Sequence, residues 1–387
     1  MTMRRTPKRG AIAIVGVAES DLGHVAPGLT PIDLMAQGVG RALEDCGLAL
    51  KDVDGVFAAS GQSRAPVMAL CEYLRITPRY QDSSNSGGAV FESTVMHAQA
   101  AIEAGMCEVA VIAYGSTQRS AGGKLISSRG YDPFVSPYHP RLPASAYALA
   151  ASRHMHEFGT TREQMAAVAV AARHWALLNP QAWEKSPLTI ADVLASRMVS
   201  TPLSVRDCCL VTDGGGAVIL TSAERARSLR KAPVYVLGVG DAISHNEIQS
   251  MRNLTTTTAV ESGKAAYRMA GLHAADVDVS ELYDAFTINT ILFLEDLGFC
   301  AKGEGGALAA SGRIAPGGDL PVNTNGGGLS YCHPGMYGLL LLVEAVRQLR
   351  GECAARQVPG AEVALVHGNG GTLSAQATVI LGGAATV

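Results

Sequence analysis

The 387-residue chain contains one pattern twice, and this repeat limits the possible folds more than any other feature. A polar turn, glycines, an apolar helix, a glycine stop and an apolar strand follow one another in SSNSGGA and the later EAGMCEVAVIAYG. The same order returns in NTNGGGL and then in QLRGE and AEVALVHGNG. Such self-similarity is typical of a duplicated unit whose copies bury a sufficient core only together. We therefore predict two related α/β halves.

The first 115 residues alternate between strand and helix patterns. Apolar strand patterns occur at 11–18, in VDGVFAAS and in EVAVIAYG, and helical patterns lie near 31–46 and 65–74. Alternation of this kind favours parallel strands joined by helical crossovers. We predict that each half has a mixed five-stranded sheet with helices on both faces. The halves should stack in layers, with the helices that follow Ser84 and the HPGM stretch at the centre.

The region from 116 to 206 departs from this alternation. It contains YDPFVSPYHPRLP, a long helical stretch and NPQAWEKSPLTIADVLASRMVSTPLS, which together indicate an excursion over the surface. We therefore predict an N-terminal half made of 1–115 and 207–232, a loop excursion over 116–206 and a C-terminal half over 233–387.

Charge and hydropathy exclude several classes of protein. The formal net charge of −3 gives no electrostatic reason to expect nucleic acid as a partner. The apolar run LLLLV at 339–343 is far shorter than the ~20 residues of a membrane span. The start MTMRRTPKRGAIAIVGVAES is interpreted as a basic leader and a first strand, because its apolar run is short and acidic residues follow it. We expect a cytoplasmic protein without a membrane segment.

Cysteine and histidine spacings do not predict a metal site. The eight cysteines form no CxxC pair, and the ten histidines form no HExxH motif. We therefore expect reduced, mostly buried thiols and no bound metal.

Three segments carry a family resemblance that covers nearly the whole chain: ELYDAFT…LEDLGFCAKGEGG, NTNGGGLSYCHPG and HGNGG. Together with the repeat, they resemble the thiolase superfamily, and in particular its sterol-carrier-protein-type thiolase branch. The resemblance implies a thiolase fold, an acyl-CoA thioester as substrate and no tightly bound cofactor. It also implies a homodimer, which we expect to pair through EVAVIAYG as an unprotected edge strand. Relatives of this branch are often paired with a small OB-fold protein that carries a zinc ribbon.

The resemblance places Ser84 where the family has its nucleophile. There, a cysteine at the start of a buried helix attacks the thioester, and the helix dipole stabilises its thiolate. Matching a CASGGA-like family segment to SNSGGA puts Ser84 at this position. Serine is also a preferred helix N-cap. Two roles therefore stay open for Ser84: nucleophile or hydrogen-bond donor in the reaction, and helix cap.

The family's GHPxG histidine matches His333 in CHPGM. The resemblance implies that His333 donates to the thioester oxygen in an oxyanion hole, and the alternative is a structural loop histidine. Tyr331 and Tyr337 flank His333 and either reach the substrate pocket or pack as ordinary aromatics.

The family's second cysteine, an acid/base for the substrate's α-proton, falls at His367 in VHGNGG. Histidine suits proton transfer near neutral pH, and the alternative is a polar cap on a strand end. Asn369 in the same motif is a further pocket candidate. Tyr283 in LYDAF takes the place of a family Asn or His and can polarise a carbonyl or relay a proton, although a phenol is a poor base. We expect Ser84, His333 and His367 to share one pocket.

Three functions follow. The first is acyl transfer or thiolysis at a carbon–carbon bond of an acyl-CoA, with serine in place of the nucleophilic cysteine. The second is a lyase that cleaves a β-hydroxyacyl-CoA by retro-aldol chemistry, for which no acyl nucleophile is needed and in which Tyr283 or Tyr331 handles the β-hydroxyl proton. The third is a non-catalytic thiolase-like subunit, because a shared fold does not by itself carry activity.

Overall fold

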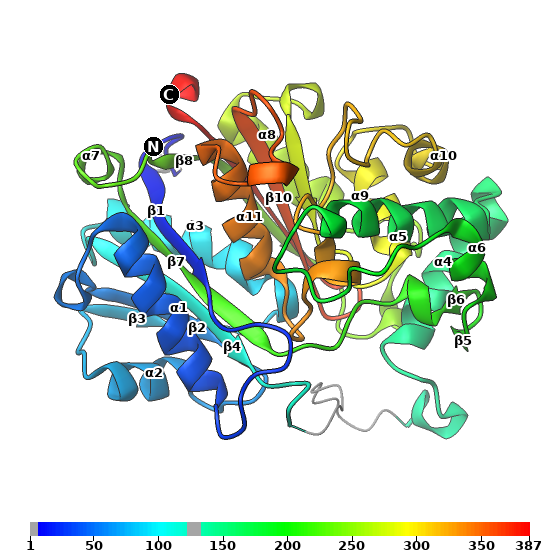
Figure 1. Ribbon diagram of the computed structural model, residues 1–387, viewed down its shortest axis with the longest axis horizontal. Helices are drawn as coiled ribbons and strands as arrows, with labels where there is room; N and C mark the ends of the chain where they lie inside the picture. The colour runs from blue at the N-terminus through cyan, green and yellow to red at the C-terminus, as the bar shows by residue number, and fades with distance from the viewer. Residues whose placement is uncertain (1–6, 122–132) are drawn as a thin grey trace, which may run out of the picture.

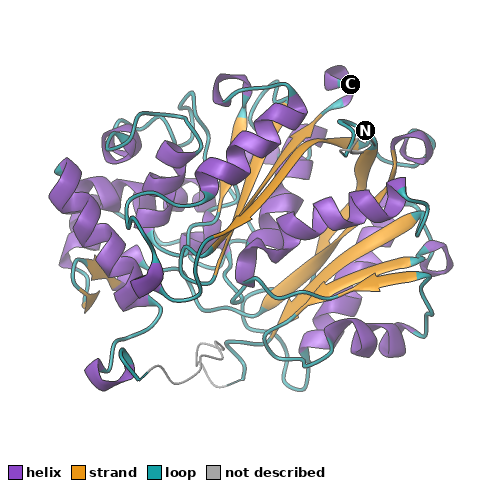
Figure 2. Ribbon diagram, turned by 180° about the vertical axis from the view of Figure 1, so that it is seen from behind, coloured by secondary structure: helices purple, strands orange, loops and turns teal. Residues whose placement is uncertain are grey.

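Two groups of strands have the same internal order in the computed structural model, which describes residues 7–121 and 133–387 (Figures 1 and 2). The strands of the first half are β1 (Ile12–Glu19), β2 (Gly55–Ala59), β3 (Tyr80–Asp82), β4 (Val109–Ser116) and β7 (Gly214–Ser222). Those of the second half are β8 (Val234–Ile243), β9 (Val279–Leu282), β10 (Val363–Gly370) and β11 (Ala375–Gly382). Residues 1–6 of the predicted basic leader lie outside the described residues.

The pairing of the strands confirms the predicted duplication. The first half runs β1-β7-β4-β2-β3, and the second runs β8-β11-β10-β9. In both halves the first three strands pair antiparallel and the next pairs parallel. In the second half, an isolated parallel bridge between Ser280 on β9 and Val322 takes the place of the parallel β2–β3 pairing of the first half.

Three details of the predicted sheets are wrong. The halves do not have separate five-stranded sheets, because Ala13 pairs with Tyr235 and Ile14 with Val234, and this β1–β8 junction makes one nine-stranded sheet. The second half also has four strands and the isolated bridge rather than five strands. In addition, EVAVIAYG forms β4, which lies between β2 and β7, so it is not an edge strand. The absence of charged residues from Val109–Ser116 reflects the burial of the whole strand.

The helices form layers around the sheet (Figure 1). The helices of the first half are α1 (Pro31–Cys46), α2 (Pro66–Leu74), α3 (Val90–Glu103) and α7 (Ala223–Ala226), and those of the second are α8 (Ala259–Ala270), α9 (Thr287–Asp296), α10 (Gly305–Ala310) and α11 (Gly338–Arg350). Helix α1 packs on β1, β7 and β4, and α8 packs on β8 and β11. The two helices α3 and α11 contact each other and strands of both halves. They form the predicted central layer.

Helix α1 occupies the predicted residues for clear local reasons. Thr30 and Asp33 form a capping box, Pro31 is the first helical residue, and Gly47 ends the helix in the left-handed region at φ 76°. Its buried residues, such as Leu34 and Val39, face the sheet.

The segment between β4 and β7 contains α4 (Ala144–Phe158), α5 (Arg162–Leu177), α6 (Ile190–Ala195) and the hairpin β5 (Met198–Ser200) and β6 (Leu203–Ser204). These elements lie together at one end of the molecule, where α5 packs against α9 and α10 of the second half (Figure 1). The boundaries drawn from the sequence between this segment and the two halves stay a prediction. Within the described ranges, no helix combines the length and apolar content needed to cross a bilayer.

Candidate functional site

Tyr283 follows β9 and is held between the two halves. Its backbone N–H donates to the His367 carbonyl at 3.0 Å, which continues the pairing of β9 with β10. Its hydroxyl donates to the Gly335 carbonyl at 3.2 Å and accepts from the Tyr337 N–H at 3.1 Å. Burial raises the pKa of the phenol well above its usual value, so the hydroxyl keeps its proton. Tyr283 is therefore a fixed, neutral hydroxyl whose remaining lone pair can accept a hydrogen bond from a substrate hydroxyl, and which can relay a proton if its bond to Gly335 opens.

His333 follows a π-helical turn at Gly327–Tyr331, and its ring lies beside Tyr283. The ring centroids of His333 and Tyr283 are 5.6 Å apart in an edge arrangement, and the His333 and Tyr337 centroids are 6.1 Å apart. The His333 backbone N–H donates to Thr212 Oγ1 at 2.9 Å, which fixes the loop.

The imidazole of His333 is buried, and neither ring nitrogen has a hydrogen-bond partner among the described residues. Burial lowers its pKa to about 4, so it is a neutral imidazole at neutral pH. A buried polar group without a partner is costly and is often a binding group for a ligand. The ring N–H of His333 is thus free to donate to a substrate oxygen.

Asp284 orders the turn before His333. Its Oδ1 accepts the Gly328 N–H at 2.6 Å, and its Oδ2 accepts the Leu329 N–H at 3.3 Å. A Cβ at residue 327 would lie 2.0 Å from Asp284 Oδ2, so only glycine allows this approach. Burial raises the pKa of Asp284 to about 7, against the two backbone hydrogen bonds.

His367 lies on β10 inside a directed chain of hydrogen bonds. The Nε2 atom bonds Gln376 Oε1 at 2.9 Å, while the Gln376 Nε2 donates to Asn369 Oδ1 at 2.8 Å. Since the amide oxygen of Gln376 accepts, the proton is on His367 Nε2. The Nδ1 atom then accepts from Thr378 Oγ1 at 2.9 Å. Burial lowers the pKa of His367 to about 4. Proton transfer by His367 would require one of these bonds to break.

Asn369 extends the chain toward the segment between β4 and β7. Its Nδ2 donates to the Tyr147 hydroxyl at 2.9 Å, and that hydroxyl donates to the Gly371 carbonyl at 3.2 Å. The ring of Tyr147 stacks on Phe286 with centroids 4.4 Å apart. Asn369 therefore holds Tyr147 on α4 against the end of β10.

Ser84 is exposed. Its place in one pocket with His333 and His367 stays a prediction. Ser84 does not cap a helix: the N-cap of the short 3-10 turn Gly87–Ala89 is Ser86, and the N-cap of α3 is Ala89. Ser84 lines a cavity of about 10 Å³ with apolar residues of the first half, including Phe57, Val90 and Ile112. A cavity of that size holds about one water molecule.

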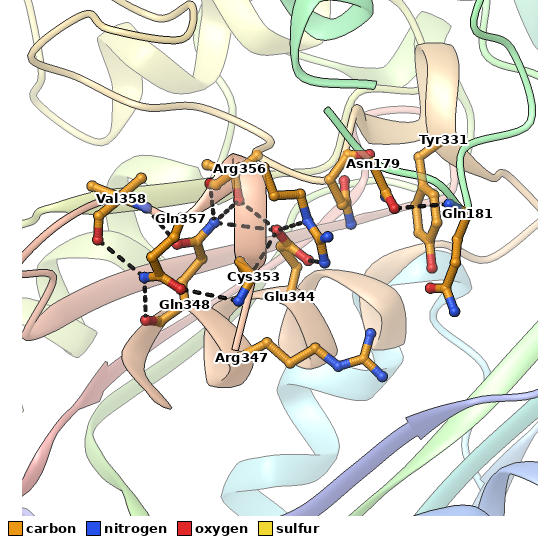
Figure 3. Close-up of polar contacts among 12 residues, drawn as sticks. Asn179, Gln181, Tyr331, Glu344, Arg347, Gln348, Cys353, Arg356, Gln357 and Val358 are labelled. Carbon is orange, nitrogen blue, oxygen red and sulfur yellow. Dashed lines mark hydrogen bonds and ion pairs between the residues drawn. The ribbon is translucent and has the colours of Figure 1, made fainter. Parts of the chain in front are cut away.

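The two tyrosines that flank His333 have different surroundings. The Tyr337 hydroxyl donates to Asn325 Oδ1 at 2.8 Å, and its ring packs edge-on against Tyr283. The Tyr331 hydroxyl donates to Glu19 Oε1 at 2.9 Å, and Arg347 forms an ion pair with the same carboxylate. Figure 3 shows Tyr331 and Arg347 beside the buried pair of Glu344 and Arg356.

The thiols are not activated. All eight cysteines are free. Burial raises the pKa of every one of these thiols, and Cys332, next to His333, has a pKa of about 12. A thiol nucleophile needs the opposite shift.

Sequence reasoning missed Glu92, Tyr147 and Thr212. Glu92 is a carboxyl in the first turn of α3, where its neighbours Val90, Phe91 and Val95 are buried. An acid flanked by apolar residues at the start of a helix is the signal that could have identified it. Tyr147 and Thr212 carried no comparable signal, because their contacts come from distant segments.

Comparisons with known proteins agree with this architecture. Residues 240–383 match the family described as Thiolase C-terminal domain-like. An acetyl-CoA acetyltransferase of Methanothermobacter thermautotrophicus is 34% identical over 376 residues, which cover 93% of this chain and 96% of the relative. A 17-hydroxy-3-oxo-4-pregnene-20-carboxyl-CoA lyase of Mycobacterium tuberculosis is 36% identical over 380 residues, covering 92% and 96%. A solved structure, the Ltp2-ChsH2(DUF35) aldolase, is similar with a TM-score of 0.89 at 30% identity, covering 98% of this chain and 99% of the other.

Proposed function

Because the chain belongs to the thiolase family and is a thiolase-like enzyme, we propose that it breaks a carbon–carbon bond of a β-hydroxyacyl-CoA thioester by retro-aldol chemistry. The observation that carries the proposal is the buried, neutral His333 with two unpartnered ring nitrogens beside the Tyr283 hydroxyl. This pair offers two hydrogen-bond groups to a substrate with two oxygens.

In the proposed step, the His333 N–H donates to the thioester carbonyl oxygen. Negative charge develops on that oxygen when the bond between the α- and β-carbons breaks, because its electron pair becomes a thioester enolate. A preorganised donor in a buried site stabilises such charge strongly. The β-hydroxyl oxygen becomes the carbonyl of the leaving aldehyde or ketone and gives its proton to the Tyr283 hydroxyl, which passes its own proton to the α-carbon. Protons and electrons therefore balance without a co-reactant.

Tyr283 would bind the β-oxygen. Its hydroxyl is already oriented by Gly335 and Tyr337, so it can hold the substrate oxygen and pass a proton while staying neutral itself. His367, Asn369 and Gln376 would act by positioning Tyr147 and the end of β10 rather than by exchanging protons with the substrate.

Acyl transfer through Ser84 is the second candidate, because the family position matches and the acetyltransferase relative is similar over nearly its full length. A serine nucleophile needs a neighbouring base. The exposure of Ser84 and its place beside a cavity of only about 10 Å³ argue for the retro-aldol reaction instead.

We further propose a partner with an OB-fold and a zinc ribbon, since the similar aldolase structure is named as a complex with a DUF35 component. A homodimer in the cytoplasm, with a coenzyme A thioester as the only small-molecule partner, completes the proposal. The free edge strand β3 is the dimer surface that we expect. Light scattering at micromolar concentration checks the dimer.

The decisive experiment supplies a β-hydroxyacyl-CoA to the purified chain, alone and with such a partner, and follows the products. Release of an aldehyde or ketone with a shortened acyl-CoA supports the lyase. Thiolysis of a β-ketoacyl-CoA with an acyl group trapped on Ser84, detected by mass spectrometry, would replace the lyase with the transferase. No turnover in either assay, with or without the partner, would leave a non-catalytic subunit.

A further inference from the structure

Glu92 is a carboxyl group sealed inside the central layer. It lies in the first turn of α3 with an exposed fraction of 1%. Neither carboxyl oxygen has a hydrogen-bond partner within residues 7–121 and 133–387. An unpaired buried carboxylate is very unfavourable, so a group in this place stays uncharged.

Two glycines of the second half make room for this carboxyl. A Cβ at residue 368 on β10 would lie 2.1 Å from Glu92 Oε2, and a Cβ at residue 338 would lie 2.5 Å from the same oxygen. Gly338 is the first residue of α11. The Glu92 side chain therefore fills the space that two missing Cβ atoms leave between α3, α11 and β10.

The same contact surface holds Tyr283. Gly88 lies one helical turn before Glu92, and a Cβ at residue 88 would be 2.1 Å from Tyr283 Cε2. The Gly88 carbonyl oxygen would in turn lie 2.3 Å from a Cβ at residue 338. From the other side, the Tyr337 N–H donates to the Tyr283 hydroxyl. The spacing between the starts of the two central helices thus sets the position of the Tyr283 ring.

We propose that Glu92, as an uncharged acid wedged between Gly338 and Gly368, is a positioning residue that fixes the spacing of these two helix starts around Tyr283. This inference rests on the proposed function for its activity readout. Its structural readout is independent of the reaction.

Apart from its own backbone N–H in the first turn of α3, the surroundings offer no free charge that would stabilise an ionised Glu92 among the described residues. Helix α11 carries Glu344, Arg347 and Arg350, and these are paired with Arg356, Glu19 and Asp45 respectively. On the other elements packed against α3, the titratable groups are Tyr114 on β4, Tyr235 and Asp241 on β8 and His367 on β10, and the helix itself carries His97 and Glu103. Towards the site, the ring of Tyr283 lies against Gly88, and His333 lies beside Tyr283. Burial raises the pKa of Glu92 to about 8. Deprotonation above that pH places a charge between the helices and should push them apart.

Hydrogen exchange measured by mass spectrometry at pH 7 and pH 9, corrected for the intrinsic exchange rate, tests this directly. In the natural protein, the protection of backbone amides against exchange in segments 86–92 and 335–342 should be several-fold lower at pH 9 than at pH 7. Glu92→Gln keeps the shape without the ionisation, and should show no such loss. The exposed Glu72 on α2 supplies the control Glu72→Gln, which should behave as the natural protein does. Equal responses of Glu92→Gln and the natural protein would overturn the proposal.

The activity arm uses the same variants. The kcat of the natural protein should fall about tenfold per pH unit above pH 8, as expected for one ionisation. In Glu92→Gln, this fall in kcat should begin at a higher pH. Glu92→Ala should lower kcat at pH 7 while KM changes little, because it empties the space between the helices. A Glu92→Gln variant that exchanges normally but is inactive at every pH would mean that the carboxyl proton itself reacts, and positioning would be wrong. If no substrate is turned over by any variant, the exchange data alone decide between the outcomes.

Discussion

The backbone N–H of Tyr337 donates to the Tyr283 hydroxyl at 3.1 Å, so the start of the last helix holds the residue that follows β9. The hydroxyl is also bonded to the Gly335 carbonyl. Both partners are backbone groups of the loop that carries His333. Any movement of that loop therefore moves the hydroxyl and the imidazole together.

Tyr283→Phe removes only this hydroxyl and should cost at least about 100-fold in kcat of the proposed reaction, the lower range for loss of a proton-transfer group. The fold should survive, since the ring still packs on Gly88. Tyr73→Phe is the control, because Tyr73 is exposed and its hydroxyl donates to Asp33 Oδ1 at 2.8 Å, away from the site. Full activity of Tyr283→Phe in steady-state kinetics would exclude a role for the hydroxyl.

Ser84→Ala should retain most of the activity, because Ser84 is exposed and retro-aldol cleavage needs no acyl nucleophile. Its free energy of unfolding should change by no more than about 0.5 kcal/mol, as at most surface sites. Ser84→Cys should give no gain in thioester exchange. Loss of turnover in Ser84→Ala, together with gain in Ser84→Cys, would favour the acyl-transfer reaction.

Gly88→Ala should abolish activity and destabilise the protein, because the new methyl group would lie 2.1 Å from Tyr283 Cε2 and 2.7 Å from the Asn369 carbonyl oxygen. The matched control is Gly40→Ala on α1, where a Cβ meets nothing within 4 Å. An exposed helical Gly→Ala change stabilises by roughly 0.5 to 1 kcal/mol. Thermal unfolding and kinetics of the two variants check the prediction, and similar behaviour of both would contradict it.

The stability of the protein should fall as the pH rises, in part because of Glu92. Its folded pKa of about 8 lies above the ordinary value of 4.5, so the folded state holds the proton that the unfolded chain releases. The stabilising contribution is complete below about pH 4.5 and is lost progressively up to pH 8, by on the order of 5 kcal/mol in total. Denaturant unfolding between pH 5 and 9 should therefore have a shallower slope for Glu92→Gln than for the natural protein. Equal slopes would show that Glu92 ionises normally.

Local signals made much of the fold predictable. The repeat predicted the duplicated halves and the central helices, and the helical pattern near 31–46 agrees with the observed bounds of α1. The junction of β1 and β8 was not predictable, because it consists of two residue pairs joining segments more than 200 residues apart. The position of EVAVIAYG inside the sheet depends likewise on the distant strand β7.

The site was partly visible in the sequence. The HPG and LYDAF motifs identified His333 and Tyr283, which the structure brings side by side. The partners of His367 on β11 and of Tyr331 at Glu19 come from remote segments, so their bonded state had no local signal. Ser84 looked like a helix start because the sequence does not reveal that a 3-10 turn at Gly87–Ala89 precedes α3.

The contact between α3 and α11 constrains how this chain can have evolved. After a gene duplication, two copies usually accumulate changes independently. Here, Gly88 and Glu92 come from one copy, whereas Gly338 and Gly368 come from the other. The Glu92 carboxyl occupies the space left by the missing Cβ atoms of Gly338 and Gly368, and the Gly88 carbonyl also lies against Gly338. A larger side chain in one half is tolerated only if the residue that it faces in the other half becomes smaller. These four positions are therefore expected to change together among descendants of the chain.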